Sequence, residues 1–173
     1  VAVDTETTGL NEMTADLVGI SLCVDAGTAC YIPLAHKKGA SDDLFGSDDL
    51  VAGQLPLGDV LDALRPVLED EAVLKIGQNM KYDAKIFHRY GVRIGPIDDT
   101  MLMSYALHAG LHNHGMDALS ERYLSHSPIP IKSLLGTGKS AITFDRVPLD
   151  KAVKYAAEDA DITLRLWELL KPQ

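Results

Sequence analysis

The stretch Val1–Leu10, VAVDTETTGL, begins as an apolar strand and ends in a Thr-Gly turn. Asp4 and Glu6 lie two residues apart within it. Alternate side chains of a strand point to the same face, so both carboxylates leave one face while Val3 occupies the other. Two carboxylates about 7 Å apart along a strand can converge on one cation or bracket a pair. Exposed acids at a strand edge are the plainer alternative.

The segments that follow predict an α/β fold. Residues 18–34 read as two strands joined by a turn at 25–28, which predicts an antiparallel hairpin. Strands and helices then alternate, which indicates a mixed central sheet (antiparallel hairpin plus parallel strands) flanked by helices. We expect strands over 1–5, 18–24, 29–34, 72–77 and 92–97, helices over 59–69, 78–90, 100–108, 116–124 and 149–170, a long surface loop over 36–56 and irregular structure over 125–146.

Length and composition indicate one domain. The chain has 173 residues, of which 46% are hydrophobic and 24% charged, as in an ordinary globular protein with a real core. We therefore expect a single domain over 1–173. No apolar run is long enough to span a bilayer and no signal segment is present, so we expect no membrane association. Because the chain starts on Val1, already within a strand, we expect a fragment of a longer protein.

The charge balance is acidic. With 25 Asp and Glu against 16 Lys and Arg, the formal net charge is −9. Proteins that bind nucleic acid by phosphate neutralisation alone are normally basic, so we expect no tight grip on duplex DNA. Lys132, Lys139, Lys151 and Lys154 could form a local basic rim or lie scattered on a solvated face.

Two further acids belong to pairs with helical spacing. Asn79 and Asp83 are four residues apart, as are Tyr155 and Asp159, so each pair is predicted to share a helix face. Either pair alone would more often be an exposed polar face. Oxygen ligands without His or Cys suit Mg²⁺ or Mn²⁺, and a carboxylate cluster that holds two such ions can support displacement at phosphorus.

The segments DTETTGL (4–10), IGQNMKYD (76–83) and YAAEDAD (155–161) together resemble the three exonuclease motifs of the DEDD nuclease superfamily. Tyr155, four residues before Asp159, resembles the tyrosine of the tyrosine-bearing subgroup. Over essentially the whole chain, the sequence is most similar to the 3′→5′ (proofreading) exonuclease domains of bacterial DNA polymerase I. This resemblance implies a ribonuclease H-like fold and hydrolysis of phosphodiester bonds at a single-stranded or frayed DNA 3′ end. It also implies an adjoining polymerase domain in the same chain, a monomer, and a place in the bacterial cytoplasm at the nucleoid.

The resemblance also implies roles for individual residues. Asp4, Glu6 and Asp159 would hold the first of two Mg²⁺ or Mn²⁺ ions, with Asp4 bridging to the second. Asp83 would hold the second ion largely through water, and Tyr155 would orient the attacking water. The residues expected to contact substrate are Thr5, Thr7, Leu10 (as a wedge at the terminal base), Gln78, Asn79, Tyr82 and Ile131.

Ile131 departs from the family pattern, which commonly has an aromatic residue there against the terminal nucleotide. Stacking of a base on an aromatic ring contributes about 1–3 kcal/mol. An aliphatic side chain keeps the apolar contact and loses part of that energy, so we expect a weaker grip on the 3′ end.

Two other functions remain open at this point. An RNA-trimming enzyme similar to ribonuclease D would share the motifs, although the segment GTGKSAITF (136–144) resembles the polymerase type. A non-catalytic structural module would be expected to have lost carboxylates, and none is lost here.

Three other patterns point to weaker alternatives. The residues Gly138-Lys139-Ser140 resemble the end of a phosphate-binding loop, but Ser133 stands where that motif needs a glycine. His108, His112 and His114 fit loop histidines better than a zinc site. Cys23 and Cys30 would face each other across the hairpin in its simplest register; a disulfide is conceivable, and two buried free thiols are favoured.

Overall fold

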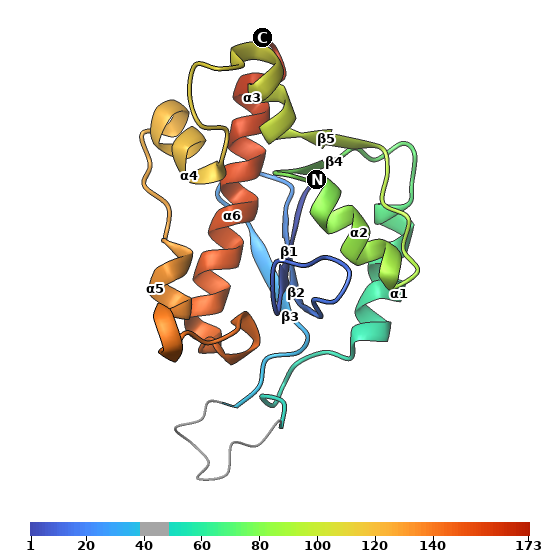
Figure 1. Ribbon diagram of the computed structural model, residues 1–173. Coiled ribbons are helices and arrows are strands. Elements are labelled where there is room, and N and C mark those ends of the chain that lie inside the picture. The colour runs from blue at the N-terminus through green and yellow to red at the C-terminus, as the bar shows by residue number, and fades with distance from the viewer. Residues whose placement is uncertain (39–48) are drawn as a thin grey trace.

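The computed structural model describes residues 1–38 and 49–173. Its centre is a five-stranded sheet in the order β3-β2-β1-β4-β5 (Figure 1). The β1–β2 and β2–β3 pairs are antiparallel, whereas β1–β4 and β4–β5 are parallel, which confirms the predicted mixed sheet of a ribonuclease H-like fold. The strands are β1 (Ala2–Thr7), β2 (Leu17–Cys23), β3 (Cys30–Pro33), β4 (Lys75–Gly77) and β5 (Ile97–Asp99).

Helices cover both faces of this sheet, with α6 on one side and α1 and α2 on the other (Figure 1). The helices are α1 (Leu57–Leu68), α2 (Lys81–Arg89), α3 (Thr100–His108), α4 (Met116–Leu119), α5 (Ile131–Leu135) and α6 (Leu149–Leu170). A π-helical turn, Ser120–Leu124, continues α4, and short 3₁₀ turns occupy Gly138–Ser140 and Phe144–Arg146. The stretch expected to be irregular therefore contains α5 and two 3₁₀ turns. Among the described residues, no helix is long and apolar enough to cross a membrane.

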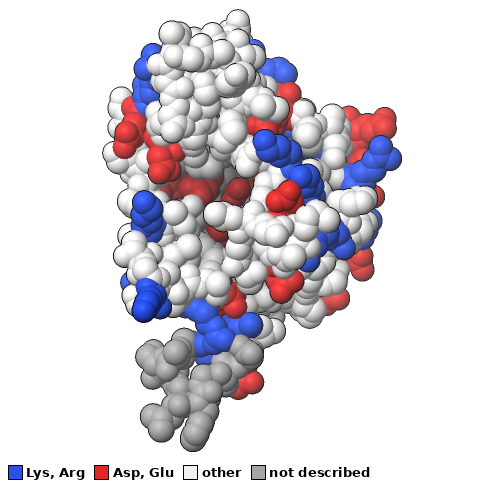
Figure 2. Space-filling view, viewed as in Figure 1, with Lys and Arg blue, Asp and Glu red and all other residues white. Residues whose placement is uncertain are grey.

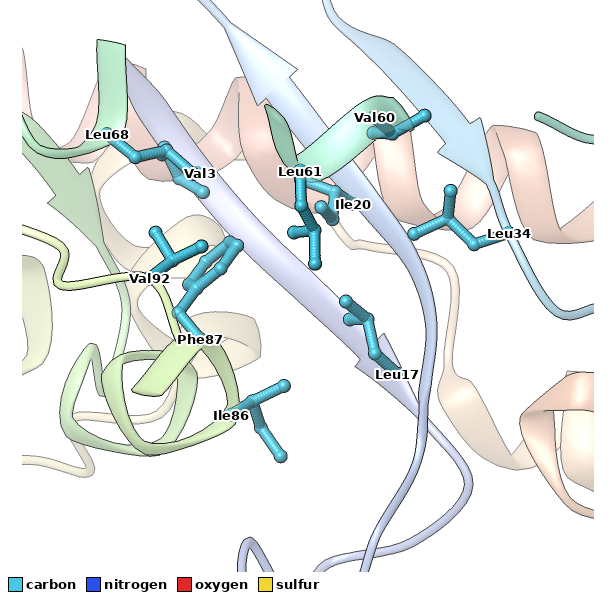
Figure 3. Packing of buried hydrophobic residues seen from close by; sticks show 10 residues of the cluster. All are labelled: Val3, Leu17, Ile20, Leu34, Val60, Leu61, Leu68, Ile86, Phe87 and Val92. Atoms are coloured by element: carbon cyan, nitrogen blue, oxygen red, sulfur yellow. The ribbon is translucent and has the colours of Figure 1, made fainter. Parts of the chain in front are cut away.

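The two faces of β1 are chemically different. Val3 packs with Ile20 of β2 against α1 and Phe87 of α2 in the largest core cluster (Figure 3). Ala2, on the opposite face, packs against Ala160 of α6. Since side chains alternate along a strand, the face that carries Ala2 also carries the two acids of β1 and directs them toward α6.

Small residues bring α6 close to the sheet. Ala152, Ala156 and Ala160 are each fully buried, and their four-residue spacing places them on one helix face. Val153, which follows Ala152, lies off this face and is 38% exposed. Because the alanine side chains are small, the helix lies close to the sheet, and Asp159, which directly precedes Ala160, is brought close to β1.

The start of α2 differs from the prediction. Asn79 has a φ of 62°, in the left-handed region, and α2 begins only at Lys81. The prediction that Asn79 and Asp83 share a helix face is therefore wrong. The bend is held by Asp99, whose carboxylate accepts hydrogen bonds from the backbone N–H groups of Asn79 (3.1 Å) and Met80 (2.9 Å). The same carboxylate caps α3 through the N–H groups of Met101 and Leu102.

The strand predicted over 92–97 is also wrong, because β5 begins only at Ile97. β4 is three residues long and pairs with Ile97–Asp99. Residues 92–96, which precede β5, pass the end of α1 instead, where the Gly95 N–H donates to the Leu68 carbonyl.

The cysteines are both free, but their placement differs from the prediction. Cys30 pairs with Leu22 rather than with Cys23, so the two side chains do not face each other. Cys23 is buried, as expected, whereas Cys30 is exposed. The one-residue difference in register moves Cys30 to the opposite face from the one assumed.

The loop expected over 36–56 lies partly outside the described residues. At its start, His36 is fully buried, which contradicts a surface loop there. Lys37 then forms an isolated bridge with Leu50.

Candidate active site

Three carboxylates meet between β1 and α6. One oxygen from each of Asp4, Glu6 and Asp159 lies within 4.8 Å of the others. Glu6 and Asp159 are buried and Asp4 is half-buried. The space-filling view shows acidic side chains at the floor of a hollow, with Lys and Arg residues on both sides of it (Figure 2). The structure thus brings together three of the four predicted acids in one group.

Burial, together with nearby negative charge, raises the pKa values of these carboxyls. Burial, and then the charge of Asp159, raises the pKa of Asp4 to about 8. The pKa of Asp159 rises to about 7 through burial, against the opposing effect of a hydrogen bond with Tyr155. The pKa of Glu6 is raised well above its usual value by burial and by the charges of Asp4 and Asp159. Without a cation, the cluster therefore holds protons at neutral pH.

The donor set fits a divalent metal ion. The Oε1 atom of Glu6 is buried and has no hydrogen-bond partner among the described residues. Buried polar atoms are normally paired, so this oxygen needs a partner. The neighbouring donors are carboxylate oxygens, the ligands that hard cations prefer. A divalent cation held here would give Glu6 its partner and offset the repulsion between the three acids.

Asp83 stands beside this group rather than in it. It is buried, and its Oδ1 accepts hydrogen bonds from the backbone N–H of Thr5 (3.0 Å) and from the Thr5 hydroxyl (2.5 Å). Its pKa is raised well above the usual value by burial and by the charge of Asp4. Thr5 was predicted to contact substrate; the structure instead gives it a contact with Asp83, and its place toward substrate stays a prediction.

A groove of about 630 Å³ opens over Asp4 and Glu6. Its lining brings together most of the residues that were predicted to contact substrate. Leu10 lines this groove with its side chain 95% exposed, and its predicted contact with a terminal base stays a prediction. The predicted residues in the lining are Asp4, Thr5, Glu6, Thr7, Leu10, Asn79, Tyr82, Ile131 and Tyr155.

The turn after β1 is fixed by Tyr82. The Tyr82 hydroxyl donates to the Gly9 carbonyl (2.6 Å) and contacts the Thr7 hydroxyl (2.5 Å). The Thr7 hydroxyl donates to the same carbonyl (2.9 Å). These bonds hold the turn that carries Leu10 against α2, so one wall of the groove is built before any substrate arrives.

Gln78 does not line the groove. Its side-chain amide donates to the His114 carbonyl (2.8 Å) and its carbonyl accepts from the Thr100 hydroxyl. These contacts commit Gln78 to neighbouring backbone and side chains, and its predicted contact with substrate stays a prediction.

Sequence reasoning missed Phe144, Leu135 and Ile142, which complete the apolar wall of the groove. All three lie in the stretch that the sequence predicted to be irregular. The signal in the sequence was the segment 136–144, which contains Ile142 and Phe144. Its resemblance to the polymerase type indicated a family and did not predict a groove wall.

The comparison with protein families decides the class of this site. The model of a family described as 3′-5′ exonuclease matches residues 1–173. The chain belongs to this 3′-5′ exonuclease family. The domain is therefore a nuclease and a hydrolase, homologous to the proofreading domain of DNA polymerase I.

Individual relatives agree with the family match. The 3′-5′ exonuclease domain is 52% identical to DNA polymerase I of Rhizobium leguminosarum over 182 residues, and 42% identical to DNA polymerase I of Pseudomonas aeruginosa over 173 residues. These matches cover 100% and 98% of the chain and 18% of each relative, so the chain spans less than a fifth of their length.

A solved structure supports the fold alone. Ribonuclease D of Escherichia coli matches with a TM-score of 0.66 and 20% sequence identity, over 99% of this chain and 38% of that one. At this identity the likeness shows the shared ribonuclease H-like architecture and says nothing of substrate.

Proposed function

We propose that this 3′-5′ exonuclease domain removes nucleotides from the 3′ end of single-stranded DNA, or from a frayed primer terminus, as the editing domain of a bacterial DNA polymerase I. The observation that carries the proposal is the group of three carboxylates within 4.8 Å, two of which, Asp4 and Glu6, line the groove. The relatives named DNA polymerase I support DNA as the substrate.

In this proposal the site holds two Mg²⁺ or Mn²⁺ ions. Asp4, Glu6 and Asp159 would hold the first and Asp83 would serve the second. Bound divalent ions supply activation of water and stabilisation of the charge that develops at the phosphate. The chain contributes a fixed set of carboxylates that need little rearrangement to receive the ions.

Tyr155 contributes a neutral hydroxyl. Burial and the charge of Asp159 raise its pKa above the ordinary tyrosine value, so the phenol keeps its proton at working pH. A neutral phenol next to Asp159 can orient the attacking water through a hydrogen bond but cannot act as a base. Tyr155 is thus proposed as an orienting group.

Selection of a 3′ end follows from the shape of the groove rather than from reading of a base. Leu10 and Ile131 offer apolar surface that accepts any terminal base. A paired end must first unpair, which costs free energy, whereas a mismatched end is already frayed. Editing selectivity would then come from the cost of unpairing.

We further propose that the domain is one unit within a longer chain that also carries a polymerase domain. The support is that the polymerase relatives are more than five times longer than the matched region. A bacterial cytoplasmic location belongs to the same proposal.

The test is release of nucleotides from 3′-labelled single-stranded DNA with Mg²⁺ or Mn²⁺. The wild-type domain should be active, whereas Asp4→Ala and Asp159→Ala should each lower the rate at least about a hundredfold. The control is Glu168→Ala, which removes an exposed acid on α6, the helix of Asp159, and should match wild type. Equal activity of wild type and both site variants, or none in any protein, would defeat the proposal. Faster degradation of RNA than of DNA under the same conditions would favour an RNA-trimming enzyme instead.

A further inference from the structure

A row of four packed rings leads from Tyr155 into the interior. The Phe144 and Tyr155 rings have centroids 5.9 Å apart, and the His36 and Phe144 rings 5.8 Å apart. The His36 and Tyr31 rings follow at 5.7 Å, edge to face, with 2.7 Å between the Tyr31 hydroxyl and the His36 Nε2 atom. Tyr31, His36 and Phe144 are all buried.

The far end of this row lies beside Glu6. Gly19 pairs directly with Glu6 across β1 and β2, so a side chain at Gly19 would share its face. The Tyr31 ring occupies that space: a Cβ atom at Gly19 would lie 2.1 Å from the Tyr31 hydroxyl oxygen. The row therefore runs from Tyr155 of α6 to a ring that lies beside Glu6 of β1.

Hydrogen bonds and an ion pair hold the backbone on which the two middle rings, His36 and Phe144, are carried. The Lys37 N–H donates to the Asp145 carbonyl (2.7 Å), and the Lys37 ammonium pairs with the Asp145 carboxylate (3.4 Å). The Gln54 side chain bonds both the N–H (2.7 Å) and the carbonyl (2.8 Å) of His36. His36 and Phe144 are thus held by residues on either side of them, so the rings have little freedom to shift.

We infer that Tyr31, His36 and Phe144 are positioning residues for the nuclease reaction, an inference that rests on the proposed function. They hold the Tyr155 ring so that its hydroxyl stays beside Asp159. Closely packed rings admit one arrangement, and a cavity in their place would let the phenol tilt. A misplacement of about 1 Å in a catalytic group can cost about a hundredfold in rate.

The main variant is Phe144→Leu, which keeps an apolar side chain and removes the ring. We expect kcat on single-stranded DNA to fall about tenfold, with the Mn²⁺ dependence unchanged because the carboxylates are left in place. KM for DNA does not serve as a readout for this variant, because Phe144 also lines the groove. The matched control is Val147→Ala, in the same buried cluster but without a ring contact to Tyr155. It should lose thermal stability and keep its kcat.

The deciding measurement repeats Phe144→Leu in a Tyr155→Phe background, using the residual activity. If the ring acts through the Tyr155 hydroxyl, Phe144→Leu should change kcat less than about twofold there, since coupled residues are not additive. Equal losses in both backgrounds, wild-type kcat for Phe144→Leu, or an equal loss in Val147→Ala would overturn the inference. An inactive wild type would instead overturn the proposed function.

Tyr31→Phe gives a second route if Phe144→Leu does not fold. It removes only the hydroxyl that meets His36 and should lower kcat about two- to fivefold, the size expected for one lost hydrogen bond. That loss should also vanish in the Tyr155→Phe background. A Tyr31→Phe variant with wild-type kcat, or with the same loss in both backgrounds, contradicts the inference.

Discussion

At the scale of single residues, the fold holds the carboxylates of Asp4, Glu6 and Asp159 close together although like charges repel one another. One oxygen of each lies within 4.8 Å of the others, and burial raises all three pKa values, with the charges of neighbouring cluster acids adding to the rise for Asp4 and Glu6. Ionising the metal-free site therefore costs free energy, and a bound cation would offset that cost.

Replacing one acid by its amide should separate stability from activity. In EDTA at pH 8, Asp4→Asn removes a repelling charge and should stabilise the fold by about 1 kcal/mol, or about 2–4 °C in Tm for a chain of this size. The same variant should lose nuclease activity. Thermal unfolding with Glu168→Gln as control measures the effect, and a Tm at or below that of wild type would contradict it.

The pH dependence of the metal-free domain follows from the same residues. In the unfolded chain an aspartate has a pKa of about 3.9. In the folded domain the pKa of Asp4 is about 8. Between these values the folded state binds the proton and the unfolded state does not, so the free energy of unfolding falls as pH rises from about 4 to about 8. Denaturant titrations in EDTA should show this fall. Saturating Mn²⁺ should reduce it, since the ion displaces the protons.

Ile131 offers a gain-of-affinity prediction. It lines the groove, and a phenylalanine there could stack on the terminal base. Ile131→Phe should strengthen binding by about 1 kcal/mol, which is about fivefold in KM for single-stranded DNA. Val24→Phe, exposed outside the groove, is the control. An unchanged or higher KM for Ile131→Phe would show that the base does not meet this side chain.

At the scale of elements, β1 and α6 build the acid cluster, and both were predictable. The D-x-E alternation fixed the face of Asp4 and Glu6, and the span of α6, Leu149–Leu170, agrees with the predicted helix. Both results depend on periodicity within one segment, which a sequence displays directly.

The start of α2 was not predictable in the same way. The left-handed conformation of Asn79 depends on the carboxylate of Asp99, twenty residues further along the chain. Phe144 was missed for a similar reason, because its place beside Tyr155 depends on His36 and β3 rather than on any local pattern. Contacts between distant segments decide such details, and one sequence does not display them.

The close approach of β2 and β3 gives a stability prediction. Gly19→Ala would place a methyl group against the Tyr31 ring and should cost about 1–3 kcal/mol through overpacking. The control is Gly58→Ala in α1, where an added Cβ meets nothing within 4 Å and alanine should stabilise the helix by up to about 1 kcal/mol. Urea unfolding compares the two, and a Gly19→Ala variant as stable as wild type would show that the Tyr31 ring can move aside.

At the scale of the whole molecule, the net charge of −9 and the acid cluster belong together. Part of the negative charge sits where cations are expected, and Lys and Arg flank the hollow (Figure 2). The groove is thus lined by acids rather than by a basic surface, and the proposed function requires cations to offset that charge before a phosphate can approach.

Substrate preference follows at this scale. With Mn²⁺ present, single-stranded DNA should be degraded fastest, a duplex with a mismatched 3′ end more slowly, and a matched duplex about tenfold more slowly still, because unpairing costs free energy. Initial rates on the three substrates measure the order. Equal rates on matched and mismatched ends would remove unpairing as the source of selectivity.

The carboxylate of Asp99 receives backbone N–H groups from two places, the bend before α2 and the first turn of α3. One side chain therefore fastens a wall of the groove to a helix outside it. In a hydrogen–deuterium exchange experiment, the amides of Asn79, Met80, Met101 and Leu102 should exchange as a single slow group. In Asp99→Ala they should become fast together, although neither pair has itself been altered.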